Sequence, residues 1–167
     1  MIIVSDTTPI NYLILVGFID ILEKLFGQVI IPEAVLAEMQ RPKTPPPVVA
    51  WIAAHPAWLE VRTANMSFFT AQKKLGAGES EAIALAKELN ADALLTDDRD
   101  ATKEARRNNL TVYSTLLILD EAAEQDLLDL PQVIQLLNQT NFRAPAALLQ
   151  TLLTQDAQRK LQRQSGS

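Results

Sequence analysis

The sequence contains no cysteine, and this absence excludes disulfides, thiolate catalysis, iron–sulfur clusters and cysteine zinc sites. It has a single histidine, His55, which excludes a histidine-rich metal site. Basic residues are outnumbered, because 15 lysines and arginines face 20 acidic residues and leave a formal net charge of −5. This balance argues against a protein that coats nucleic acid non-specifically. It is compatible with an enzyme that cuts nucleic acid at an acidic, metal-filled site.

The sequence also lacks an export signal and a long apolar run. The first residues, MIIVSD, have no basic stretch before their apolar part, and Asp6 soon interrupts them. The most apolar segment, 10–22, contains Asn11, Gly17 and Asp20 and is too short to span a bilayer. We therefore expect a soluble, cytoplasmic protein with no membrane segment.

Short apolar, β-branched runs alternate with helical patterns along much of the chain, whose length of 167 residues favours one domain. Such alternation predicts an α/β domain with a largely parallel sheet. From residue 115 onward the pattern is helical, with breaks near Pro131 and Pro145, and residues 161–167 are expected to fray. Strands are expected at 2–4, 28–31, 93–96 and 110–113, with a weaker candidate at 58–61, and helices at 11–21 with a break or bend near Gly17, and at 32–39, 48–54, 79–89 and 101–108.

Aspartates follow two of the predicted strands at the point where each strand ends. Asp6 comes after the first strand, and Asp97 and Asp98 come after the strand at 93–96. Because the carboxyl ends of parallel strands meet at one edge of a sheet, Asp6 and Asp98 should lie near each other. Neighbouring carboxylates repel unless a positive charge lies between them, and oxygen ligands favour Mg²⁺ or Mn²⁺ over zinc. Each aspartate taken alone fits a helix N-cap equally well.

Two glutamates are candidates to complete such a cluster. Glu79 opens the clearest helix directly after Gly76-Ala77-Gly78, where it can face a loop cavity or stabilise the helix dipole as an exposed residue. Glu38 lies on the helix after the second strand, and the sequence does not decide between a surface residue and a site residue there. Glu81 points in a different direction from Glu79, and we expect it to be solvated.

Basic residues recur at helical spacing after the acidic turn at 97–100. Such a stripe fits a solvated helix face, or a surface that steers phosphates toward the acids. An acidic protein that acts on an acidic polymer needs local basic residues to offset repulsion. The candidates for RNA steering are Arg99, Lys103, Arg106 and Arg107, together with Lys73 and Lys74.

Four segments stand out together: IIVSDTTPI, IIPEAVLAEM, GAGESEAIALAKEL and ALLTDDRDA. They resemble the PIN domain family, the metal-dependent ribonuclease fold of VapC-type toxins, and in particular a compact stand-alone bacterial branch with a helical tail. The resemblance implies a PIN-like three-layer fold, with a central, mainly parallel sheet flanked by helices and a helical C-terminal extension. It also implies a single domain over 1–160, with a core at about 1–114 and C-terminal helices at about 115–160.

The same resemblance implies a metal-dependent endoribonuclease that hydrolyses RNA phosphodiester bonds with one or two Mg²⁺ or Mn²⁺ ions. It implies the toxin of a toxin–antitoxin pair, with a small antitoxin protein as partner and a homodimer. The sequence departs from the family pattern at the Asp97-Asp98 doublet, where many relatives have one acid in a Thr-x-Asp pattern, and at position 79, where toxins commonly have aspartate. The implied catalytic residues are Asp6, Glu38, Glu79 and Asp98, the implied metal ligands are Asp6, Glu79, Asp97 and Asp98, and the supporting residues are Thr7, Thr8 and Asp100.

Two other functions compete with this one. A catalytically silent PIN-like module would bind RNA or protein without cutting, and metal-dependent turnover separates it from an enzyme. A Mg²⁺-binding phospho-receiver domain also gathers acids at a sheet edge. A receiver usually has its acidic pair after the first strand and a lysine after the last, whereas here Asp6 stands alone and no lysine follows residues 110–113.

Overall fold

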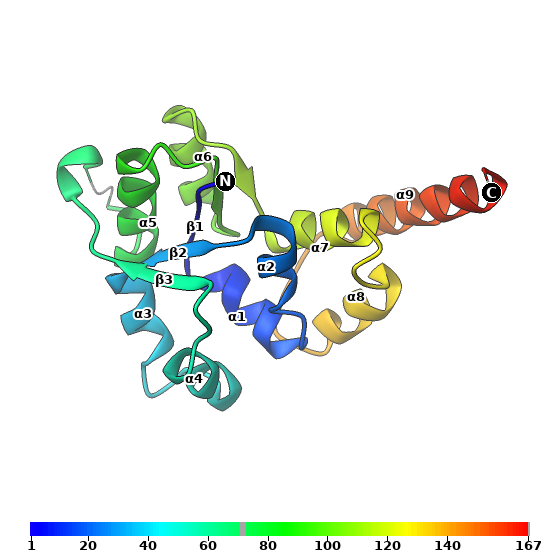
Figure 1. Cartoon of the computed structure of the whole chain (residues 1–167), viewed down its shortest axis with the longest axis horizontal. Coiled ribbons are helices and arrows are strands. Elements are labelled where there is room, and N and C mark those ends of the chain that lie inside the picture. The colour runs from blue at the N-terminus through cyan, green and yellow to red at the C-terminus, as the bar shows by residue number, and fades with distance from the viewer. Residues whose placement is uncertain (71–72, 167) are drawn as a thin grey trace. The chain divides into compact units, whose positions relative to one another are not determined.

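The computed structural model describes residues 1–70 and 73–166, and its centre is a parallel sheet, as the strand and helix alternation predicts (Figure 1). The described strands lie in the order β3-β2-β1-β4-β5, and every neighbouring pair is parallel. The weak strand candidate at 58–61 is therefore a real edge strand. The strands are β1 (Ile3–Ser5), β2 (Val29–Pro32), β3 (Leu59–Arg62), β4 (Ala93–Leu95) and β5 (Val112–Tyr113).

Helices join the strands within a compact unit that spans Met1–Thr115. Most of them begin at residues that the sequence marks as helix starts. Asp6 and Asp98 accept backbone N–H bonds at the first turns of α1 and α6, and Pro46 opens α4. The helices are α1 (Thr7–Leu15), α2 (Ile21–Phe26), α3 (Glu33–Met39), α4 (Pro46–Ala53), α5 (Ala77–Glu88) and α6 (Arg99–Arg107), with a short 3₁₀ turn, η1, at Met66–Phe68.

The break predicted near Gly17 is confirmed, whereas the helix expected to begin at residue 11 begins earlier, and a separate helix starts at residue 21, where the segment was expected to end. α1 begins at Thr7, because the Asp6 side chain accepts a hydrogen bond from the N–H of Thr8 and starts the helix directly at the strand end. The chain then turns at Gly17, whose φ of 82° is a conformation that glycine adopts without steric cost. A separate helix, α2, begins after that turn.

The strand order defines where this fold can hold a site. From β1 the chain moves outward to β2 and β3, and it then returns to build β4 and β5 on the other side of β1. The topological switch point therefore lies between β1 and β4, and open parallel sheets bind ligands beyond the carboxyl ends of the strands at that point. The order also differs from the 2-1-3-4-5 order of receiver domains, which counts against a phospho-receiver.

The core is formed where α5 packs on the centre of the sheet. The α5 residues 82–86 are all buried, and they belong to one apolar cluster with Val4, Ile30 and Leu94 from three adjacent strands. Five consecutive residues cover every side of a helix, so α5 is buried all round along this stretch.

From Leu116 onward the chain forms a second compact unit of helices. Its helices are α7 (Thr115–Glu124, which begins at the last residue of the first unit), α8 (Leu130–Asn138) and α9 (Ala146–Ser165). Pro131 lies in the first turn of α8 and Pro145 precedes α9, so both predicted breaks are confirmed. None of the helices in the described ranges combines the length and apolar character that crossing a bilayer requires.

The prediction that residues 161–167 fray is wrong as far as Ser165, because α9 remains helical to that residue. Side chains of this helix form ion pairs within the second unit. Lys160 Nζ lies 3.0 Å from Asp129 Oδ1, and Arg163 pairs with Asp126. These contacts and the good helix propensity of the Gln, Arg and Lys residues explain why the polar last turns of α9 are helical, beyond the part of the helix that buries Leu152.

Truncating Leu94 in the centre of the sheet should destabilise the protein. Leu94 is 1% exposed, so Leu94→Ala should lower the free energy of unfolding by about 2–5 kcal/mol. Urea unfolding followed by circular dichroism measures this change. Met66→Ala is the matched control, since Met66 is 40% exposed and its loss should change the free energy by less than about 0.5 kcal/mol. Equal effects of the two substitutions would contradict the assignment of the core.

Candidate functional site

The carboxyl ends of β1 and β4 bring the predicted strand-end acids to one edge of the sheet. Ser5 lies opposite Leu95 in the paired strands, and the N–H of Asp6 donates to the carbonyl of Leu95 at 3.0 Å. Asp6, Glu79 and Asp98 lie along this side of the fold, and we call these three residues the acid edge. Asp6 is its innermost member, with only 2% of its surface exposed.

The Asp6 carboxylate is held by neutral donors on two sides. Oδ1 accepts from the N–H of Thr8 at 3.3 Å, and Oδ2 accepts from the hydroxyl of Thr96. Burial raises the pKa of Asp6 well above its usual value, and the negative charges of Asp97 and Glu79 raise this pKa further. The hydrogen bonds from Thr96 and Thr8 act in the opposite direction. A buried carboxylate whose charged neighbours are also acidic is a group that a cation would stabilise.

Thr96 connects the two strand ends, and the sequence analysis missed it. Its hydroxyl donates to Asp6 and accepts from the N–H of Asp98 at 3.2 Å, and the residue is 1% exposed. Thr96 therefore connects the Asp6 side chain, at the end of β1, to the backbone N–H of Asp98, which follows β4. The Thr-x-Asp pattern of residues 96–98 contained the signal, because a hydroxyl two residues before an aspartate can bond to that residue's N–H.

The two members of the aspartate doublet have different surroundings. Asp97 accepts from Thr115 through both oxygens, from the N–H at 2.8 Å and from the hydroxyl at 2.5 Å. Burial raises the pKa of Asp97, and the bonds from Thr115 partly offset that effect. Asp98 accepts at 2.7 Å from the N–H of Ala101 through Oδ2, and its Oδ1 has no hydrogen-bond partner among residues 1–70 and 73–166. Of the doublet, Asp98 is thus the member with an oxygen to offer a ligand.

Glu38 links three helices at the same edge. Its Oε1 accepts from the N–H of Gly78 in the first turn of α5 at 3.1 Å, and its Oε2 accepts from the hydroxyl of Thr7 in α1. A Cβ on Gly78 would lie 2.6 Å from Glu38 Oε1, so a side chain there would displace the carboxylate. Glycine at position 78 therefore lets the Glu38 carboxylate approach the start of α5 this closely.

The glutamates of the first turns of α5 have separate partners. The Glu79 side chain folds back over the start of its own helix, since its Oε2 lies 2.6 Å from where a Cβ on Gly76 would be. The expectation that Glu81 is solvated is wrong, because its Oε1 accepts from the N–H of Ala34 at 3.3 Å and it is half-buried. Glu81 thereby satisfies a free N–H in the first turn of α3.

The remaining predicted residues fall into two groups. Thr7 and Thr8 lie in the first turn of α1 and support Glu38 and Asp6 through the bonds described above. The basic residues of α6 divide between a cavity and open solvent. Asp100, Lys103 and Arg107 line that cavity, whereas Arg99 and Arg106 are exposed and do not line it.

The donor chemistry of the acid edge fits a hard divalent cation, because all of its candidate ligands are carboxylate oxygens. The side chains are not gathered as a completed metal cluster. In the ranges that the structure describes, no three acidic or histidine side chains converge closely enough to hold a metal ion. Two acids at this side of the sheet are turned away by the bonds they accept, Glu38 toward Gly78 and Asp97 toward Thr115.

The fold is that of an α/β protein with acids beyond the switch point of its parallel sheet. Comparison with known proteins identifies the family. The family model described as PIN domain matches residues 2–158, so the chain belongs to the PIN domain family. A solved structure, a PilT N-terminus domain protein from the hyperthermophilic archaeon Sulfolobus solfataricus P2, has the same fold. It is 20% identical with a TM-score of 0.51, over 73% of this chain and 93% of that chain. No curated protein matches the sequence.

The contact between Glu38 and Gly78 generates a prediction about stability. Gly78→Ala should destabilise the protein by about 1 kcal/mol or less, because the new methyl group displaces the flexible end of Glu38 from its hydrogen bonds. In the Glu38→Ala variant there is no carboxylate to displace. Gly78→Ala should therefore cost much less stability in that background than it costs in the parent protein. Free energies of unfolding for the four proteins give the coupling. Purely additive effects would mean that the two residues do not touch.

The burial of Asp6 makes the metal-free protein sensitive to pH. Because the pKa of Asp6 is higher in the folded state than in the unfolded state, this group destabilises the fold as pH rises through the unfolded value, about 3.9, toward the folded one. Asp6→Asn removes that charge; its Oδ1 can still accept from the N–H of Thr8, whereas its Nδ2 would have to donate to the Thr96 hydroxyl and so reverse that hydrogen bond. In EDTA the variant should gain stability over the parent between acidic and neutral pH, measured by thermal melts. A constant difference across that range would contradict the raised pKa.

Proposed function

We propose that this protein is a metal-dependent endoribonuclease. The observation that carries the proposal is the buried Asp6 carboxylate at the switch point, joined through Thr96 to Asp98 and subject to the negative charge of Glu79. Membership of the PIN domain family supports it, because PIN domains are usually nucleases. Catalytic sites of this sheet type lie where these acids lie.

Asp6, Glu79 and Asp98 would hold one or two Mg²⁺ or Mn²⁺ ions. A bound metal supplies a water of lowered pKa and neutralises charge on the phosphodiester. The other residues would act through these three. Thr96 holds the Asp6 and Asp98 loops in register, and Glu38 fixes the start of α5, from which Glu79 projects. Their hydrogen bonds favour positioning roles for Glu38 and Asp97 in place of direct metal contact.

The biological part of the proposal is that the protein is the toxin of a toxin–antitoxin pair. It is supported by the resemblance of four of its segments to VapC-type toxins. In this proposal the substrate is RNA in the cytoplasm, the protein forms a homodimer, and a small antitoxin protein holds it inactive. Co-purification with the product of a neighbouring small gene tests the antitoxin part independently of the chemistry.

A catalytically silent PIN-like module is the second candidate. It is favoured by one observation, that the described part of the chain contains no group of three acidic or histidine side chains placed to hold a metal ion. Such a module would bind RNA or protein through the same surface and would not turn over. RNA that is bound without being cut in the presence of metal would support it.

Cleavage of a mixed RNA pool tests the enzyme directly, with Mg²⁺, Mn²⁺ and EDTA lanes. Cleavage should require metal, and Asp6→Asn and Asp98→Asn should each reduce it by more than about 100-fold, since residues that only support metal ligands already cost about 10–100-fold. Asp20→Asn is the matched control, because Asp20 is exposed and belongs to neither strand end. Full metal-dependent cleavage by Asp6→Asn would overturn the assignment of the acid edge.

A further inference from the structure

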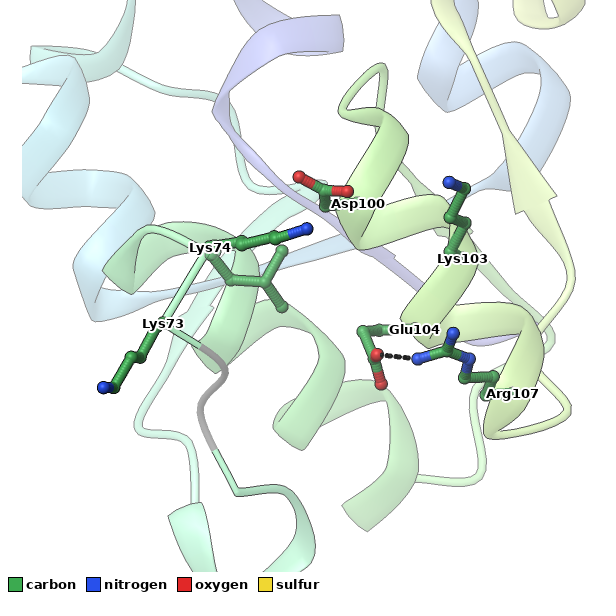
Figure 2. Close-up of a pocket in the computed structure, with 7 residues that line it drawn as sticks. Lys73, Lys74, Asp100, Lys103, Glu104 and Arg107 are labelled. Carbon is green, nitrogen blue, oxygen red and sulfur yellow. Dashed lines mark hydrogen bonds and ion pairs between the residues drawn. The ribbon is translucent and has the colours of Figure 1, made fainter.

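A cavity of about 550 Å³ lies between the chain segment that leads into α5 and one face of α6 (Figure 2). We call it the basic groove. Four of its lining side chains are basic and two are acidic, in a protein whose formal net charge is −5. Positive charge is therefore concentrated here against the overall balance of the chain. The lining residues are Lys73, Lys74, Leu75, Asp100, Lys103, Glu104 and Arg107.

The cations of the basic groove are not equally available to a ligand. Arg107 Nη1 lies 2.5 Å from Glu104 Oε1, so Glu104 already neutralises this guanidinium. Lys73, Lys74 and Lys103 are exposed, and no carboxylate of the described residues lies within ion-pair distance of them. In Figure 2 the Lys74 side chain extends from the α5 approach toward α6, Lys103 lies on α6, and the Lys73 side chain points away from α6. Two unpaired ammonium groups, those of Lys74 and Lys103, thus belong to the two walls of this cavity.

The lining chemistry selects a particular kind of anion. No aromatic side chain lines the basic groove, so it offers no platform on which a nucleobase could stack. Lysine binds phosphate as a point charge and does not read base edges in a fixed geometry. Free lysines on two walls of an open cavity suit successive phosphates of one strand, bound without regard to sequence.

The walls of the basic groove are the chain segments that carry two members of the acid edge. Leu75 immediately precedes Gly76, the N-cap of α5, and Glu79 lies in the first turn of that helix. On the opposite wall, Asp100 follows Asp98, the N-cap of α6, by two residues. A nucleic-acid strand bound in the groove would therefore lie beside the segments that carry Glu79 and Asp98.

We propose that the basic groove binds the phosphate backbone of a single-stranded RNA whose neighbouring phosphodiester reaches the acid edge. The choice of RNA rests on the proposed function, whereas the position of the strand rests on the placement of the free lysines. Lys74 and Lys103 each contact backbone phosphate, and Arg107 stays paired with Glu104. Arg99 and Arg106 lie outside the groove and contribute little.

Binding in the absence of cleavage tests this inference. The probe is a short fluorescein-labelled single-stranded RNA, and its anisotropy is followed in EDTA across a series of salt concentrations. The double variant Lys74→Gln, Lys103→Gln should bind roughly tenfold more weakly, and the slope of log affinity against log salt should become shallower by about 1.4, near 0.7 for each lost contact. The control double variant Lys24→Gln, Lys87→Gln removes the same charge outside the groove and should bind like the parent.

The results separate the groove from the chemistry. Equal affinity and slope for the parent and the first variant would overturn the proposal, and so would a parent that fails to bind the RNA. If the parent binds RNA as predicted but does not cut it, the groove proposal stands and the nuclease proposal is wrong. If the parent cuts RNA but the groove variant binds as tightly as the parent, the nuclease proposal stands and the groove proposal is wrong. Thermal melts of all variants show whether each is folded.

Discussion

The pairing of β1 with β4 is the constraint on which the candidate site depends. This pairing places a carboxylate, Asp6, at the end of a fully buried strand, where water cannot solvate its charge. Thr96 and the N–H of Thr8 supply the compensating hydrogen bonds, and both come from residues that the two strand ends bring together. Asp98 is bound into the same arrangement through its N–H. The geometry of the acid edge is therefore a consequence of strand register.

The sequence predicts what depends on periodicity and strand ends. Alternating β-branched runs and helical patterns predict the parallel sheet, and the rule that sites lie beyond strand ends predicts that Asp6 and Asp98 share an edge. The sequence does not predict which side chains form hydrogen bonds between segments that are far apart along the chain. Nothing local indicates that Asp97 bonds to Thr115 or that Glu81 bonds to Ala34, because these partners are separated by many residues.

Charge is divided sharply between neighbouring segments. The ends of β1 and β4 are followed by acids, and the free lysines of the basic groove lie on α6, which follows β4, and on the loop that leads into α5. An acidic protein thus keeps a local positive surface next to its most negative edge. This division lets a polyanion approach on one side while a cation is attracted to the other, and an average over the whole chain would conceal it.

The bond between Asp97 and Thr115 limits how the chain can be divided. By compactness the first unit ends at Thr115, which suggests a convenient point to shorten the protein. Yet the N–H and hydroxyl of Thr115 are the donors that satisfy a carboxylate buried beside the acid edge, and Thr115 is held in place as the first residue of α7. A fragment cut at the boundary would fray this turn and leave Asp97 without donors. The smallest fragment that keeps the bonds of Thr115 to Asp97 therefore includes the beginning of α7.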